Sequence, residues 1–133
     1  WMRVLRSPDG RGKKIVLYST SASALLMHGQ KMVDKISAVL QSFFVNREQV
    51  ALIWRPDPKV KKVIRKKNPG LWQSYRDLLQ KYREEGWGIV DDSDQPDLSV
   101  SLCDACYGDG GSVMHTCRVQ GKFVMLQDGN SGL

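Results

Sequence analysis

The chain has 133 residues, of which 41% are hydrophobic and 26% charged, with 12 glycines, 5 prolines and 3 cysteines. This is the composition of an ordinary globular domain that buries about two thirds of its extended surface, so it needs neither a disulfide scaffold nor a structural metal in order to fold. Lys and Arg number 20 against 14 Asp and Glu, and the resulting formal charge of +6 favours anionic partners.

The first predicted strand is the β-branched and aromatic run within Lys14–Ser19, and a long loop is expected after it. From Lys31 onward, apolar residues recur on one helical face and predict an amphipathic helix; they are Met32, Ile36, Val39, Leu40, Phe43 and Phe44. The apolar run Val50–Trp54 predicts the second strand, and we expect Pro56 and Pro58 to end its pairing.

The second half of the chain alternates helical patterns with short apolar runs. Four helices are predicted there, at Val60–Ile64, Leu71–Tyr82, Pro96–Cys103 and Val113–Gln120. Three further strands are predicted, at Trp87–Val90, Ala105–Tyr107 and Phe123–Leu126. We expect residues 13–127 to form the domain, residues 1–12 to be a lead-in outside the core, and residues 128–133 to be a polar tail.

Five strands that alternate with helices, each strand a nearly continuous apolar run, predict a parallel sheet covered by helices on both faces. The leading topology is therefore a Rossmann-like, doubly wound α/β fold. In such a fold, ligands bind beyond the carboxyl ends of the strands where the strand order reverses. For the order 3-2-1-4-5, this point lies between the first and the fourth strand.

Two unusual loops fall at that point. The loop after the first strand is rich in hydroxyls and includes Thr20 and Ser21. The loop after the fourth strand contains Gly110, Gly111 and Ser112, and its glycines allow backbone N–H groups to approach an anion at a helix N-terminus. The alternative is a tight turn followed by an N-cap.

Cationic side chains gather near the second of the predicted strands. Arg55 follows this strand directly and could hold a phosphate bidentately, or it could pair with Asp57 in a salt-bridged turn. Six of the 20 bases fall within Lys59–Lys67, where they could attract an anionic polymer or lipid headgroups. The alternative for this cluster is the solvated face of a helix.

The two histidines and three cysteines suggest other chemistry. Cys103 and Cys106, followed by His115 and Cys117, have a zinc-like spacing. Because the first pair straddles a predicted helix end and a buried strand, we expect packing thiols, with neither a metal nor another cofactor. For acid–base work His28 is the better candidate, because it falls in the predicted loop after the first strand, but the catalytic residue stays unknown.

The longest apolar runs reach about a quarter of the roughly 20 residues that a membrane-spanning helix needs. The sequence shows no secretory leader pattern, and an odd number of cysteines favours a reducing compartment. We therefore expect a cytoplasmic protein, which its basic cluster could attach to the inner face of a membrane.

Four segments of the chain together resemble one family; they are Lys14–Ser21, Leu52–Pro58, Trp87–Asp92 and Tyr107–Val113. In these segments the chain resembles the C-terminal half of bacterial CDP-glycerol glycerophosphotransferase-like proteins, over about residues 13–127. The resemblance implies one half of a GT-B fold, in which the Rossmann-like C-terminal half binds the nucleotide-activated donor. An N-terminal half contributes to the acceptor site and to catalysis, so this chain alone is expected to be inactive.

The resemblance also implies site residues. Those expected to meet the donor diphosphate or its nucleotide are Thr20, Ser21, Arg55, Gly110, Gly111 and Ser112. At two positions the sequence departs from the family pattern, because Asp57 stands where a histidine is usual and Gly111 where a second serine is common.

Three functions stay open on the sequence. The first is the donor-binding half of a transferase that uses CDP-glycerol or a similar donor. The second is a non-catalytic nucleotide- or phosphate-binding module, favoured by Asp57. The third and least favoured is a basic nucleic-acid-binding domain, which only the Lys59–Lys67 cluster supports.

Overall fold

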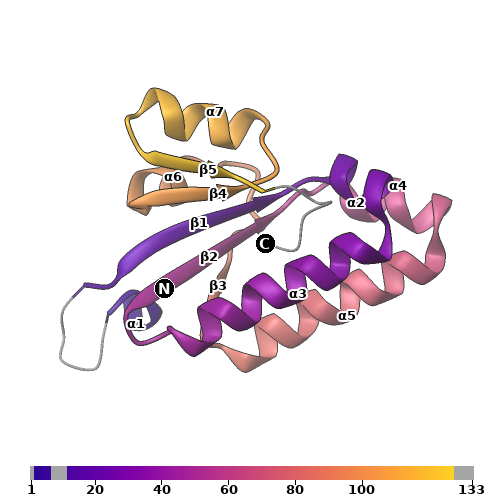
Figure 1. The fold of residues 1–133 in the computed structure, drawn as a ribbon, viewed down its shortest axis with the longest axis horizontal. Coiled ribbons are helices and arrows are strands. Elements are labelled where there is room, and N and C mark those ends of the chain that lie inside the picture. The colour runs from indigo at the N-terminus through magenta and orange to yellow at the C-terminus, as the bar shows by residue number, and fades with distance from the viewer. Residues whose placement is uncertain (1, 7–11, 128–133) are drawn as a thin grey trace.

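The computed structural model describes residues 2–6 and 12–127, so the predicted polar tail at 128–133 lies outside the described residues. Its sheet has five strands, all paired in parallel in the order β3-β2-β1-β4-β5 (Figure 1). The strands are β1 (Lys14–Thr20), β2 (Val50–Pro56), β3 (Ile89–Val90), β4 (Ala105–Gly108) and β5 (Phe123–Leu126). The predicted Rossmann-like α/β fold is confirmed.

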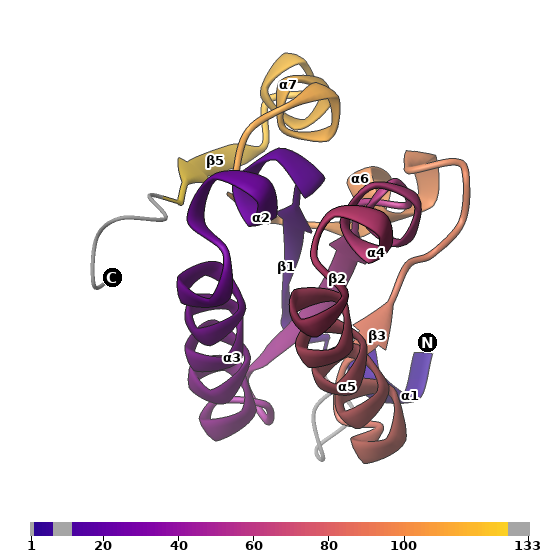
Figure 2. The same ribbon diagram turned by 90° about the vertical axis from the view of Figure 1, so that its right-hand side faces the viewer.

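Helices cover both faces of the sheet. They are α1 (Met2–Leu5), α2 (Ala22–His28), α3 (Gln30–Val45), α4 (Val60–Lys67), α5 (Pro69–Glu85), α6 (Asp97–Leu102) and α7 (Ser112–Val119). Figures 1 and 2 show α3 and α5 side by side on one face, while α7 lies on the other. None of the helices in the described ranges is both long enough and apolar enough to cross a bilayer.

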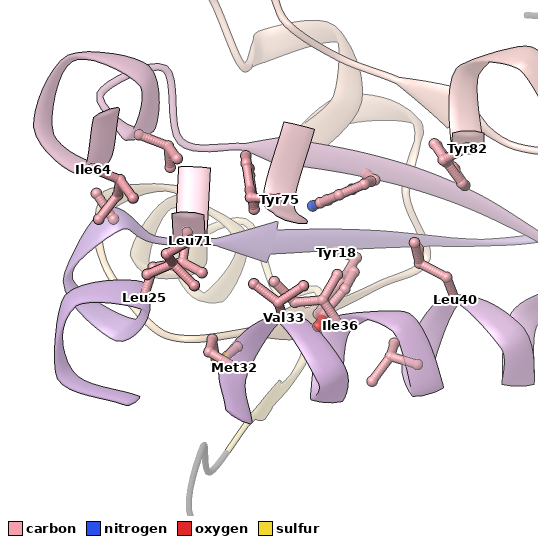
Figure 3. Close-up of a cluster of buried hydrophobic side chains, with 14 of the residues drawn as sticks. Tyr18, Leu25, Met32, Val33, Ile36, Leu40, Ile64, Leu71, Tyr75 and Tyr82 are labelled. Atoms are coloured by element: carbon pink, nitrogen blue, oxygen red, sulfur yellow. The ribbon is translucent and has the colours of Figure 1, made fainter. Parts of the chain in front are cut away.

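Alternate residues of the central strands point to opposite faces. Tyr18 and Trp54 are buried with residues of α3 and α5, and Figure 3 shows this cluster. Leu17 and Ile53, one residue earlier in each strand, are buried on the other face with Val100 of α6. Because both faces are buried, β1 and β2 have no polar face, which explains their continuous apolar sequence.

The prediction that residues 1–12 lie outside the core is wrong for Leu5. Its side chain is buried with Leu17 and Ile53, and its carbonyl accepts a hydrogen bond from the Lys13 N–H at 2.9 Å. Burial of the apolar Leu5 side chain against Leu17 and Ile53 explains why this short segment packs on the sheet.

The prediction of a long loop after the first strand is also wrong, because α2 begins at Ala22. The Ser21 hydroxyl accepts a hydrogen bond from the Ala24 N–H at 3.1 Å, which caps this helix, and Ala22 and Leu25 anchor it in the core. His28 is the last residue of α2 rather than a loop residue.

Pro56 does not end strand pairing as predicted, since it is in register with Thr20 of β1. The neighbouring strand β3 ends at Val90, opposite Trp54, so no strand flanks Pro56 on its other side. A proline is tolerated where the ladder needs no N–H donor.

Replacing Leu5 by Ala should lower the free energy of unfolding by about 2–3 kcal/mol, because the substitution leaves a cavity in a buried cluster. Urea denaturation measures the change, and Arg6→Ala, at an exposed position beside it, is the control. Equal, negligible effects of both substitutions would show that the N-terminal segment contributes nothing to the core.

Candidate functional site

An open cleft of about 380 Å³ lies at the carboxyl ends of β1, β2 and β4, where the strand order reverses. All six predicted site residues line it, namely Thr20, Ser21, Arg55, Gly110, Gly111 and Ser112. The cleft wall also includes Ser19, Val113 and the segment 56–59. The topology therefore gathers residues as distant in the sequence as Thr20 and Ser112 in one hollow.

The glycine-rich loop leaves hydrogen-bond donors free at the cleft. Gly110 and Gly111 have φ values of 92° and 97°, a region that other residues rarely adopt. Among the described residues, the N–H groups of Gly111, Ser112 and Val113 have no hydrogen-bond partner, and neither does the Ser112 hydroxyl. These donors begin the eight-residue helix α7, whose dipole adds partial positive charge.

The opposite wall is formed by Thr20 and Ser21, whose hydroxyls already serve the fold. The buried Thr20 hydroxyl accepts a hydrogen bond from Trp54 Nε1 at 3.1 Å. The Ser21 hydroxyl caps α2. Both residues line the cleft. Because their hydroxyls are already hydrogen-bonded, these are less available to a ligand than the Ser112 hydroxyl.

Asp109 holds the two walls together, a role that the sequence analysis missed. Its carboxylate accepts hydrogen bonds from the Ser21 N–H at 2.8 Å and from Gln127 Nε2 at 2.9 Å. Tyr18 in turn donates its hydroxyl to Gln127 Oε1 at 2.8 Å. Burial raises the pKa of Asp109, although the hydrogen bonds from Ser21 and Gln127 oppose that rise.

Arg55 pairs with Asp91, not with Asp57 as one alternative held. Its Nη1 lies 3.2 Å from Asp91 Oδ2, and both side chains are buried. Desolvation disfavours the Asp91 anion, but hydrogen bonds from Ser93 and Ser99, together with the Arg55 charge, hold the pKa of Asp91 below its usual range. Arg55 lines the cleft with its charge already balanced.

Asp57 has a structural position at the cleft wall. One carboxylate oxygen accepts a hydrogen bond from the Ala22 N–H at 3.0 Å, and the other from the Lys59 N–H at 2.9 Å. The carboxylate therefore fixes the start of α2 and the turn into α4 together.

The exposed cation at the cleft is Lys59, which the sequence analysis placed only in the basic cluster. Its side chain lines the cleft and forms no ion pair with any described residue. Its position directly after the proline-rich turn was the available sequence clue, since that turn ends at the same sheet edge as the glycine loop.

The histidines and cysteines lie elsewhere. Neither His28 nor His115 lines the cleft. Cys103, Cys106 and Cys117 are buried against α7 and the sheet, and burial raises the pKa of Cys103 to about 12. Within residues 2–6 and 12–127, no group of three or more His, Cys, Asp or Glu is arranged to hold a metal ion.

Comparison with protein-family models and with the sequences of curated proteins finds no match for this chain. Its function must therefore be inferred from the chemistry of the cleft and from the four sequence segments described above.

Replacing Asp91 by Asn should lower the free energy of unfolding at pH 7 by about 3 kcal/mol, because it leaves the buried Arg55 charge unbalanced. The native-state pKa of Asp91 is lowered, so its contribution is complete above the unfolded value of about 3.9 and is lost as pH falls through the native value. The difference in the free energy of unfolding between the wild type and the Asp91→Asn variant should therefore become smaller below about pH 4.

Urea denaturation at pH 7, 5, 4 and 3 measures this dependence. Asp92→Asn is the matched control, because Asp92 pairs with Arg83 on the surface and should change stability by less than about 1 kcal/mol. A gap that stayed constant with pH would contradict a stabilising Asp91 charge.

Proposed function

We propose that this chain is the donor-binding half of a CDP-glycerol glycerophosphotransferase-like enzyme, and that its cleft binds the diphosphate of a nucleotide-activated small molecule. The observation that carries the proposal is the set of unpartnered N–H donors at Gly111, Ser112 and Val113, with the free Ser112 hydroxyl, in one cleft. Donors without partners at a helix N-terminus favour an anion.

Three kinds of interaction would hold a diphosphate there. The first turn of α7 offers N–H groups and the helix dipole, and Lys59 offers an exposed positive charge. Arg55 would act mainly by orientation, because its interaction with Asp91 fixes the guanidinium beside the cleft. Asp109 would keep the α7 loop and the start of α2 at a fixed separation.

The proposed reaction is transfer of a phosphoglycerol-type group. An acceptor hydroxyl loses its proton to the solvent and attacks the phosphorus distal to the nucleoside. The new P–O bond completes a phosphodiester, and the nucleoside monophosphate leaves with the electrons of the broken P–O bond. Donors at the α7 N-terminus would stabilise the negative charge that develops on the phosphoryl oxygens. The family resemblance assigns the acceptor site to an N-terminal half, so this chain alone should bind the donor without turnover.

A second function, a phosphate-binding module without catalysis, is favoured by Asp57. Its carboxylate stands in the wall of an anion site and is fixed by two backbone N–H groups. A negative charge at this place repels a diphosphate, so donor affinity should be moderate even where all other contacts form.

Replacing Ser112 by Ala should weaken binding of CDP-glycerol about 10-fold, because a hydrogen bond to a charged group is lost. Titration calorimetry with CDP-glycerol, CDP and inorganic diphosphate measures the affinity. His115→Ala, at an exposed position one turn along the same helix and outside the cleft, is the control and should bind like the wild type.

Two results would contradict this proposal. One is no saturable binding of any of the three ligands by the wild type. The other is an equal loss of affinity in the Ser112 and His115 variants, which would place the ligand elsewhere. A preference for CDP-glycerol over diphosphate alone would support recognition of the whole donor.

Replacing Asp57 by Asn should tighten diphosphate binding about 5- to 10-fold, because a repulsive charge is removed while one carbonyl oxygen still accepts a backbone hydrogen bond. The same titration tests this, with Asp77→Asn on the exposed face of α5 as a control of equal charge change. Equal gains in the two variants would indicate a response to net charge and not to this site.

A further inference from the structure

Helix α4 carries a concentrated and unbalanced positive charge. Lys61, Lys62, Arg65 and Lys66, together with Pro58, line an open groove of about 570 Å³ that has no carboxylate in its wall. None of these four cations forms an ion pair with a described residue. Each is exposed, so the repulsion among them is relieved only by solvent and salt.

The helical period separates this basic face from the core. The four cations occupy two pairs of positions one turn apart, while Val60 and Ile64 on the other side of α4 are buried. The cations could therefore be engaged by an external surface with no change in the packing of the helix. Cations in the last turn of α4 also match its dipole, which keeps the charged helix stable.

Exposed apolar side chains lie on the helix beside it. Helix α2 packs against α4, and Figures 1 and 2 show both at the same end of the molecule. Met27 of α2 is 76% exposed and Leu26 is 45% exposed. Exposed apolar side chains on α2 and exposed cations on the adjoining helix α4 supply the two attractions that hold a peripheral protein at a lipid surface.

We propose that the basic face of α4, with Leu26 and Met27 of α2, binds the surface of an anionic phospholipid membrane. The cations would meet the headgroup phosphates and the apolar side chains would enter the interface. A single-stranded nucleic acid fits less well, because α4 has no aromatic residue on which bases could stack. Pro58 lines both the groove and the cleft, so membrane binding would bring the cleft close to the lipid surface.

This inference does not depend on the proposed donor binding, and its test uses no nucleotide. Sedimentation with vesicles of phosphatidylcholine and phosphatidylserine at 7:3, against pure phosphatidylcholine, measures partitioning at 0.1 M salt. The variant with Gln at positions 61, 62, 65 and 66 should partition at least about 100-fold less, as expected for losing four charges near an anionic surface.

The matched control replaces four exposed cations outside this face by Gln and has the same net charge; these are Lys31, Arg76, Lys81 and Arg118. It should lose less than about 5-fold. Leu26→Ser with Met27→Ser should weaken partitioning about 10-fold or more without changing its dependence on salt, since the cations remain. Circular dichroism confirms that each variant is folded.

Several outcomes would overturn the proposal. They are no preference of the wild type for phosphatidylserine vesicles, equal losses in the α4 variant and its control, and no effect of the apolar replacements. Tighter binding to inorganic polyphosphate or to single-stranded RNA, at the same salt and with the same dependence on α4, would assign the face to a soluble polyanion instead.

Discussion

The geometry of the cleft depends on the carboxylate of Asp109. Asp109 lies in the loop after β4, and its side chain hydrogen-bonds the loop after β1 through Ser21 and the end of β5 through Gln127. The backbone adds a second tie, because the Asp109 N–H donates to the Ser19 carbonyl. A Cβ at Gly108 would overlap that same carbonyl, so a glycine is needed where strands β1 and β4 meet. The free donors of α7 are thereby held at a fixed distance from the opposite wall.

Most of the charge on the side chains of the cleft is already balanced within the protein. The charge of Arg55 is matched by Asp91, and Asp57 adds a negative group to the same wall. Affinity for an anion must then come chiefly from backbone donors and from Lys59, which do not require a buried unpaired charge. This arrangement allows the wall of the cleft to remain stable when the cleft is empty.

Much of the fold follows from the sequence, because strands buried on both faces must be continuously apolar. Val50–Trp54 was predictable on this basis. The apolar run Phe123–Leu126 also predicted a strand, although β5 lies at the edge of the sheet and is largely exposed. The six residues of the predicted site followed from where parallel strands end. Contacts between distant residues were not predictable. Burial of Leu5 depends on a space left by other elements, and the Asp91 partner of Arg55 comes from a different strand end. Helix α2 was missed because its serines also fit a loop.

The cysteine thiols lie on only one side of the molecule. All three cysteines belong to the layer of α6, α7 and β4, and each is at most 1% exposed. Burial raises the pKa values of Cys103 and Cys106, which leaves almost no thiolate on these two residues while that layer is closed. A thiol-specific reagent should therefore react only after α6 and α7 have moved away from the sheet, so the rate of labelling reports the opening of one half of the core. The opposite layer of α3 and α5 holds no cysteine and stays silent in such an experiment.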